Sequence, residues 1–260
     1  MLKTSPVAAV DRLVRILDSF SVDQPAWSLA ELSVHLRLPK STLHRFLTSL
    51  ETHDILRRNP DDRLWRPGYR LLGWGELVEK TLGLNHLARP LMNEIAASTG
   101  EMVVLTVYSE QESVCIEKVD ARHSVRLALE VGTRRPVHAG ASSKILTAYL
   151  PDAEVQEAIQ VRGLPRLCTN TITDAEELLA ELASIRKLGY AQSIEETDPG
   201  AWGIATPIFD REGVMVGAIG IAGPIQRYSE ELARDYVTLC RAACQKLSEQ
   251  IGARSVQRVS

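Results

Sequence analysis

The chain has 260 residues, of which 45% are hydrophobic and 24% charged, with a formal net charge of −3. This composition is typical of a globular protein large enough for two domains, and the negative charge argues against a protein that coats nucleic acid along its whole length. The sequence holds no run of about 18 apolar residues, and its first residues, MLKTSPVAAVDRLV, lack the apolar core of a signal peptide. We therefore expect a cytoplasmic protein without a membrane partner.

Charge is unevenly distributed along the chain. Residues 1–68 hold 10 Lys and Arg against 8 Asp and Glu, whereas the remainder holds 20 against 25. Only the front of the chain has a basic excess, and it is small. Non-specific affinity for DNA should therefore be modest unless several copies act together.

The first predicted helix begins at Ser5 and Pro6, which suit an N-cap and a first helical turn. An apolar stripe follows it. Its members are Val7, Val10, Leu13, Val14, Leu17 and Phe20. Residues 21–27 then form a loop.

Residues 28–50 predict two short helices joined by a tight turn. Ser28 and Glu31 have the spacing of a capping box, and Pro39 interrupts the apolar pattern where a second helix can begin. The apolar positions of the two helices are Leu29, Leu32, Leu36, Leu43, Phe46, Leu47 and Leu50. This arrangement is that of a helix-turn-helix.

The opposite side of the second helix carries side chains that donate hydrogen bonds. They suit contacts to base edges and phosphates in a major groove. The candidate DNA contacts on this helix are Lys40, Ser41, Thr42, His44, Arg45 and Thr48. An ordinary helical hairpin with a solvated face is the alternative, which the following residues make less favourable.

A basic hairpin follows the two helices. Two short strand-like runs, at 55–59 and 63–66, flank the turn Pro60-Asp61-Asp62. Arg57, Arg58 and Arg63 are placed for phosphate or minor-groove contact. Three helices and this wing predict a winged helix-turn-helix domain over residues 1–68.

A linker helix is expected next, over residues 69–82. Leu71, Leu72, Leu77 and Leu82 give it an apolar side that could pair with a second copy of the chain. We place the domain boundary after it, with residues 83–260 forming the second domain.

The second domain alternates strands and helices. Five strands are expected, at 102–108, 113–119, 125–131, 204–209 and 214–222. Helices are expected at about 144–150, 153–162, from a cap at Thr173 or Asp174 to Gly189, and from Ser229 to about 251. Strands joined by hairpins, with grouped helices, predict an α+β fold with a mainly antiparallel sheet.

The four cysteines, Cys115, Cys168, Cys240 and Cys244, have no metal-finger spacing. We interpret them as small core residues in a reducing compartment, with a redox or metal sensor as the alternative. No metal and no cofactor is expected.

Several segments together resemble the IclR family of bacterial transcription regulators, over essentially the whole chain. In the front domain they are LAELSVHLRLPKSTLHRFLTSLETHDIL and RLWRPGYRLLGWG. In the second they are GTRRPVHAGASSKILTAYLP, GYAQSIEETDPGAWGIATPIFDREG and AIGIAGP. Their order along the chain makes the match specific.

The resemblance implies a winged-helix DNA-binding domain, a linker helix and a GAF-like effector-binding domain. It also implies double-stranded operator DNA, a small-molecule effector, often a carboxylic acid, and self-association as a dimer or a tetramer. Such proteins commonly govern a neighbouring catabolic operon, as repressors or as activators.

The resemblance further implies where an effector binds. A backbone anion site falls at Ala141 and Ser142, since N–H groups at a helix start suit a carboxylate. Family members that bind very small oxoacids carry polar side chains at four other positions, which here are Ser193, Gly203, Gly220 and Ala222. Because only Ser193 keeps a hydroxyl, this pocket is expected to be roomier and less polar.

Three lip positions that are apolar in those relatives are Leu127, Arg135 and Ala201 here. We hypothesise that the effector is a larger carboxylate with an apolar or aromatic body, its acid held by Arg135 and the helix start. The alternative is that Arg135 points to solvent.

Two other functions are weighed. An enzyme could use His138 with the acidic run Glu195-Glu196-Thr197-Asp198, but that run lies in a Pro- and Gly-containing loop where solvated carboxylates are expected, without a nucleophile or metal set. An architectural DNA-binding protein would show no effector-dependent change in operator affinity. We expect a non-enzymatic regulator.

Overall fold

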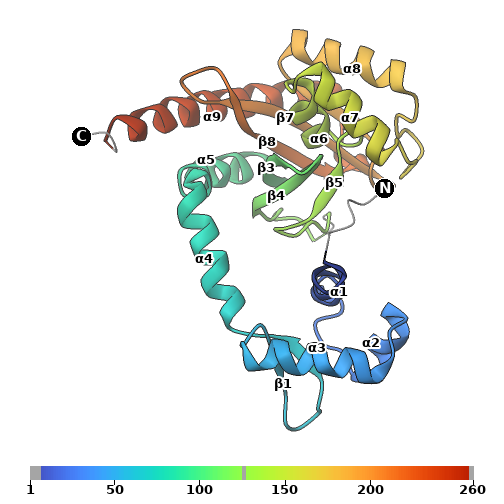
Figure 1. Ribbon diagram of the computed structural model, residues 1–260. Coiled ribbons are helices and arrows are strands. Elements are labelled where there is room, and N and C mark those ends of the chain that lie inside the picture. The colour runs from blue at the N-terminus through green and yellow to red at the C-terminus, as the bar shows by residue number, and fades with distance from the viewer. Residues whose placement is uncertain (1–6, 125–126, 258–260) are drawn as a thin grey trace. The chain divides into compact units, whose positions relative to one another are not determined.

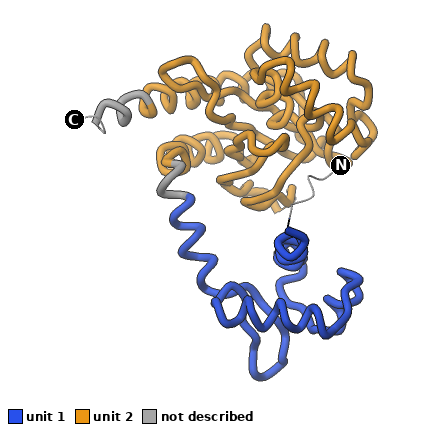
Figure 2. The backbone as a smooth tube through the Cα atoms, viewed as in Figure 1, with its two compact units in different colours: residues 1–82 blue, residues 83–260 orange. Residues whose placement is uncertain are grey.

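The computed structural model describes residues 7–124 and 127–257, with side chains except at 79–82 and 252–257. The expected N-cap pair Ser5 and Pro6 and the first residues of the strand expected at 125–131 lie outside this description. The chain divides into two compact units, residues 1–82 and 83–260 (Figure 2). Each unit has its own hydrophobic core.

In the part of the chain that the structure describes, the first unit contains three helices, a two-stranded hairpin and a fourth helix (Figure 1). Its elements are α1 (Ala8–Leu17), α2 (Leu29–Leu36), α3 (Lys40–Thr52), β1 (Leu56–Arg58), β2 (Trp65–Pro67) and α4 (Arg70–Leu82). The strands β1 and β2 pair antiparallel, and Trp27 adds a single bridge to Trp65. Helices α2 and α3 with this hairpin form a winged helix-turn-helix.

Local sequence signals explain the boundaries of the two central helices. Ser28 and Glu31 form the expected capping box at the start of α2, and each satisfies a backbone N–H of the other. Arg37 ends that helix in a left-handed conformation, and Pro39 is the N-cap of α3. The turn between α2 and α3 is therefore as short as the sequence predicts.

The core of the first unit lies under α2, α3 and the hairpin. Leu32, Leu43, Leu47 and Trp65 are almost completely buried in it. The predicted apolar stripe of α1 divides, because Leu13 and Leu17 pack against the core while Val10 and Val14 are exposed. The buried residue of α1 is Ile16, which the predicted stripe omits. Helix α4 likewise exposes four large apolar side chains, Leu72, Trp74, Leu77 and Val78.

The second unit is built on a six-stranded sheet in the order β5-β4-β3-β8-β7-β6, in which every neighbouring pair is antiparallel. The strands are β3 (Met102–Ser109), β4 (Glu112–Val119), β5 (Arg134–Pro136), β6 (Ala191–Ile194), β7 (Ala201–Phe209) and β8 (Met215–Pro224). This sheet confirms the expected α+β class.

Helices cover both faces of this sheet (Figure 1). On one face α5 (Leu84–Thr99) and α9 (Glu230–Gln257) pack together over β3, β7 and β8. On the other, α6 (Ala141–Ala148) lies against β7 and β8 and is covered by α8 (Ala175–Leu188). Helix α7 (Asp152–Arg162) contributes Val155 to this second core.

Two strand predictions require correction. Residues 127–131 are not a strand, because β4 pairs instead with β5 at Arg134–Pro136. Leu127 and Leu129 still alternate inward, against Val104 and Cys115, which explains the strand-like pattern. The sequence does not predict strand β6, because its four residues, which pair only with β7, are too few to show a recognisable alternation of apolar and polar side chains.

Candidate nucleic-acid interface and ligand cavity

Helix α3 presents the predicted polar face to solvent. Ser41, His44, Arg45 and Thr48 are exposed, as is Lys40 at the helix start, while Thr42 is half-buried. Leu43, Leu47 and Leu50 on the opposite side are at most 2% exposed, so the rotation of α3 is fixed by the core. The candidate DNA contacts therefore lie together on an accessible surface.

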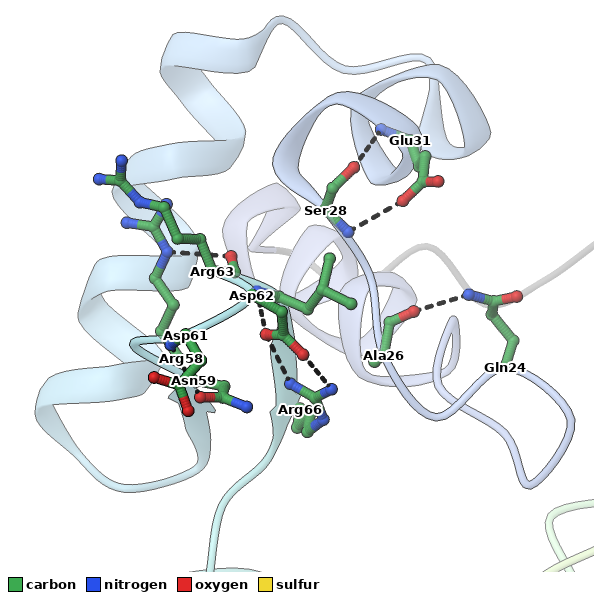
Figure 3. Close-up of polar contacts among 11 residues, drawn as sticks. Gln24, Ala26, Ser28, Glu31, Arg58, Asn59, Asp61, Asp62, Arg63 and Arg66 are labelled. Atoms are coloured by element: carbon green, nitrogen blue, oxygen red, sulfur yellow. Dashed lines mark hydrogen bonds and ion pairs between the residues drawn. The ribbon is translucent and has the colours of Figure 1, made fainter.

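Two wing arginines are held by the hairpin that carries them. Arg57 donates from Nε to the carbonyl of Pro67 at 3.2 Å, and its guanidinium lies 4.8 Å from the centre of the Tyr69 ring. Arg58 donates from Nε to the carbonyl of Arg63 at 3.1 Å (Figure 3). These bonds fix the base of each guanidinium and leave its outer N–H groups available for phosphate.

The turn of the wing is ordered by the side chains of Asn59 and Asp62. Asn59 Oδ1 accepts from the N–H of Asp61, and Asp62 accepts from the N–H of Leu64 and from both terminal nitrogens of Arg66, at 3.0 and 2.6 Å (Figure 3). The hydrogen bonds from Arg66 lower the pKa of Asp62 to about 2. Sequence reasoning missed this pair, although the four-residue separation across a turn is its signal.

Arg63 has a different environment from its neighbours in the wing. Its φ is +59° and its side chain is exposed. Among the residues that the structure describes, its guanidinium has neither a hydrogen bond nor an ion pair. Arg63 thus presents an exposed cation on an ordered turn.

The second unit contains a cavity of about 320 Å³ between the sheet and the start of α6. Eight of the nine residues assigned to an effector pocket line it. They are Leu127, Arg135, Ala141, Ser142, Ser193, Ala201, Gly203 and Ala222. The rest of its wall is largely apolar, with Met102, Val104 and Ile221 from the strands.

Gly220, the ninth residue, lies behind this wall. A Cβ at this position would come 2.9 Å from both Ser142 Oγ and the carbonyl oxygen of Ile204, so the α6 start packs directly on its backbone. At Gly203 a Cβ would meet Ala141 and Ala222 at 3.8 and 3.9 Å, which are ordinary contacts. The two glycines therefore have different roles: Gly220 allows close packing and Gly203 leaves space.

Helix α6 begins at Ala141, three residues earlier than expected, with Gly140 as its N-cap. The N–H of Gly140 donates to Glu196 Oε2 at 3.0 Å. The N–H groups of Ala141 and Ser142 have no acceptor among the described residues. Two backbone donors at a helix start thus remain available where both residues line the cavity.

Arg135 lines the mouth of the cavity rather than pointing to solvent alone. Its Nη2 donates to both carboxylate oxygens of Asp198, at 2.9 and 3.3 Å. The side chains of Arg135 and Asp198 are 29% and 48% exposed. Sequence reasoning placed Arg135 at this lip but did not pair it with Asp198, which lies 63 residues away.

A buried ion-pair network stands behind the start of α6. Lys144 Nζ donates to Glu196 at 2.7 Å and to Glu181 at 2.8 Å, and the Lys144 side chain is 2% exposed. Burial raises the pKa of Glu196, against the opposing effect of Lys144. The expectation that every carboxylate of the acidic run is solvated is therefore wrong for Glu196.

His138 is fully buried. Its Nε2 lies 3.0 Å from the carbonyl oxygen of Pro165, and burial lowers its pKa. Because the carbonyl oxygen can only accept, Nε2 carries a proton, and burial favours the neutral form of the ring. His138 therefore packs as a core residue, whereas Glu196 is engaged by Lys144 and Gly140.

All four cysteines are buried free thiols, and burial raises the pKa of Cys244 to about 11. Within residues 7–124 and 127–257, no three His, Cys, Asp or Glu side chains are grouped as metal ligands would be. In the same part of the chain, no helix has the length and apolarity needed to cross a bilayer.

Comparisons with known proteins follow the same division of the chain. The family model described as the IclR helix-turn-helix domain matches residues 9–60, and the one described as bacterial transcriptional regulator IclR C-terminal matches residues 77–249. The HTH-type transcriptional regulator KdgR of Dickeya chrysanthemi is 30% identical over 95% of this chain and 80% of its own length. The HTH-type transcriptional regulator KipR of Bacillus subtilis is 31% identical over 88% of this chain and 91% of its own.

A solved structure is similar over both units. It is an IclR homologue of Microbacterium hydrocarbonoxydans complexed with 4-hydroxybenzoate, with a TM-score of 0.81 and 29% identity. The match covers 94% of this chain and 99% of the other.

Proposed function

The chain belongs to the IclR family of bacterial transcriptional regulators, and we propose that it is a sequence-specific DNA-binding regulator controlled by a small carboxylate with an apolar or aromatic body. The observation that carries this proposal is the combination, in one chain, of an exposed donor-rich helix in a winged unit and a cavity with cationic and helix-start groups in the other unit. The first suits DNA, and the second suits a small anion.

DNA recognition is assigned to α3 and the wing. Helix α3 enters the major groove with Ser41, His44, Arg45 and Thr48 toward base edges and phosphates, and Arg57, Arg58 and Arg63 contact the backbone or minor groove beside it. All of these residues except the half-buried Arg58 are exposed, which supports this assignment because a side chain must reach beyond the protein surface to contact a groove. The regulator thus binds operator DNA through residues 1–68.

Self-association supplies the electrostatic attraction that one copy lacks. Residues 1–68 carry a small positive excess, so a dimer or a tetramer multiplies the phosphate contacts. Helix α4 is the proposed pairing element, since Leu72, Trp74, Leu77 and Val78 leave large apolar side chains in solvent. We assign residues 69–82 to this linker role and residues 83–260 to effector binding.

The effector is assigned to the cavity of the second unit. Its volume of about 320 Å³ suits a small ring or chain, and its wall is mostly apolar. The acid binds Arg135 and the free N–H groups of Ala141 and Ser142, and the body packs on Leu127, Ala201 and Ala222. The 4-hydroxybenzoate complex of the Microbacterium relative supports this class of ligand.

Regulation follows if the acid binds two states of the protein unequally, since only differential affinity can change operator binding. The proposed target is a neighbouring catabolic operon whose enzymes degrade the acid. An architectural protein is the second candidate, and the cavity argues against it because a purely structural unit needs no open cavity with unpaired backbone donors at a helix start.

Fluorescence anisotropy tests the proposal, with DNA from upstream of the protein's own gene and of the adjacent genes. Arg45→Ala should weaken operator binding by about 5- to 150-fold, the range of about 1–3 kcal/mol for a base contact. Lys187→Ala, an exposed change on α8, is the matched control. Aromatic and aliphatic acids should alter the affinity of the unchanged protein and affect Arg135→Ala less.

Operator affinity that no acid alters would favour the architectural alternative. Equal acid affinity of the unchanged protein and Arg135→Ala would remove Arg135 from the site. Recovery of the acid unchanged after incubation separates a sensor from an enzyme.

A further inference from the structure

The guanidinium assigned to the effector is already occupied by a carboxylate of the chain. Arg135 Nη2 donates to both oxygens of Asp198, and both side chains line the mouth of the cavity. An incoming carboxylate therefore meets a cation whose charge is already neutralised. This arrangement makes Asp198 a competitor of the ligand.

The loop that carries Asp198 is fixed by other residues. Glu195 accepts the N–H of Gly200 at 2.8 Å, and Glu195 N–H donates to the carbonyl of Ala201. Thr171 donates to the carbonyl of Glu196 at 2.6 Å. The backbone on both sides of Asp198 is thus held without help from the Arg135 ion pair.

The Asp198 carboxylate itself is held by a single residue among those that the structure describes. Among the described residues, Arg135 is its sole hydrogen-bond partner, and its side chain is 48% exposed. A rotation of that side chain can release it into water while the loop stays in place. Exchange of one carboxylate for another at Arg135 therefore requires no rebuilding of the fold.

We propose that Asp198 is a specificity-determining residue that occupies Arg135 until an effector carboxylate displaces it, an inference that rests on the proposed carboxylate effector. Asp198 lowers the affinity for every anion, because the two carboxylates compete for one guanidinium and repel one another. The effect is larger for a dianion, whose second charge adds to the repulsion. Uncharged ligands of the same shape are unaffected.

The substitution Asp198→Asn removes the charge and keeps an oxygen that accepts from Arg135. Isothermal titration calorimetry of the full chain should use 4-hydroxybenzoate, terephthalate as a dianion and 4-hydroxybenzamide as a neutral compound of the same shape. We expect Asp198→Asn to bind 4-hydroxybenzoate about tenfold tighter, the scale of one charge-assisted contact. Terephthalate should gain more, and the amide should not gain.

Three further variants separate charge competition from a general effect. Asp198→Glu keeps the competing charge and should bind the acids as the unchanged protein does. Asp152→Asn, which alters the exposed pair with Arg186 elsewhere in the same unit, should change no affinity. In an Arg135→Ala background there is no guanidinium to compete for and only the repulsion remains, so Asp198→Asn should increase the affinity for the acids less than it does when Arg135 is present.

The outcomes distinguish this inference from the proposed function. If the acids bind, Arg135→Ala weakens them and Asp198→Asn does not tighten them, then Asp198 is no competitor and the inference fails alone. If no acid binds the unchanged protein or Asp198→Asn, the proposed carboxylate effector fails and the inference fails with it. Thermal unfolding of each variant establishes that the protein titrated is folded.

Discussion

Glu196 and Asp198 lie two residues apart in the loop between β6 and β7, yet their carboxylates are held in opposite ways. Glu196 is 7% exposed and bonds to Lys144 and to the N–H of Gly140. Asp198 is half-exposed and bonds to Arg135 at the cavity mouth. We call the first group the fixed side of the cavity and the second the exchangeable side.

Burial explains the difference between these two sides. A buried charge that loses its partner has no water to replace it, so the Lys144 network is costly to break. A partly exposed charge that loses its partner is solvated at once, so the Arg135 pair can exchange. One loop can therefore both build the start of α6 and leave a cation accessible to a ligand.

The largest expected effect comes from breaking the fixed side. Lys144→Met removes the cation between Glu181 and Glu196. We expect a loss of about 3–5 kcal/mol in the free energy of unfolding, because Glu196 is left buried without its charged partner. Urea unfolding followed by near-ultraviolet circular dichroism measures it.

Two variants control this measurement. Lys187→Met, on the exposed side of α8, should change the free energy of unfolding by less than about 0.5 kcal/mol. Adding Glu196→Gln to Lys144→Met should restore part of the loss, since the unpaired charge is gone. A loss below about 1 kcal/mol for Lys144→Met would show that the network is not desolvated and would remove the contrast between the two sides.

Two glycines extend the comparison to the wall of the cavity. Gly220→Ala places a methyl group 2.9 Å from Ser142 Oγ and from the carbonyl oxygen of Ile204, where the start of α6 packs on β8. We expect a loss of about 1–3 kcal/mol in the free energy of unfolding from this overpacking. Gly203→Ala meets only ordinary contacts and should be neutral or stabilise by about 0.5 kcal/mol, as alanine does over glycine in a strand.

Gly203→Ala, which should not lower the stability of the fold, should instead weaken ligand binding. The added methyl group enters the cavity, so Gly203→Ala should bind large acids more weakly while its thermal stability is retained. Calorimetric titration with acids of increasing size checks this. If Gly203→Ala and Gly220→Ala lowered the free energy of unfolding equally, Gly203 would not border free space in the cavity.

Local signals made much of the first unit predictable. Ser28 and Glu31 cap α2 because both partners lie within one helical turn, and the exposed face of α3 follows from the spacing of Leu43, Leu47 and Leu50. The same holds in the second unit for Asp174, which caps α8 by accepting from Glu177 N–H. Each of these signals is contained in a few consecutive residues.

The cavity could be predicted only in part. The family resemblance gave positions along its wall, but the pairings Arg135 with Asp198 and Lys144 with Glu196 join residues 63 and 52 apart. Nothing in the local sequence distinguishes Glu196 from Asp198, because burial is decided by which strands pair. The absence of the expected strand over 127–131 has the same cause, since Leu127 and Leu129 can alternate inward without hydrogen-bonding to a neighbouring strand.

The exposed pair of the wing gives the smallest expected effect and completes the comparison. Hydrogen bonds from Arg66 lower the pKa of Asp62 to about 2 from 3.8. A lowered pKa means that the pair favours the folded state above about pH 4 and that this contribution is lost as the pH falls through about 2. Carboxyl-carbon NMR should give a midpoint near 2 for Asp62, rising toward 3.8 in Arg66→Ala.

Because solvent screens the Asp62–Arg66 pair, the lowered pKa of Asp62 should contribute little to the stability of the fold. Because Asp62 and Arg66 are both solvated, Arg66→Ala should move the midpoint of the Asp62 titration without a measurable change in the thermal unfolding temperature, and added salt should reduce the shift. Arg63→Ala, which removes a neighbouring exposed cation, should leave the Asp62 midpoint nearly unchanged. If Arg66→Ala destabilised the fold as strongly as Lys144→Met, burial would not be what divides fixed from exchangeable ion pairs in this chain.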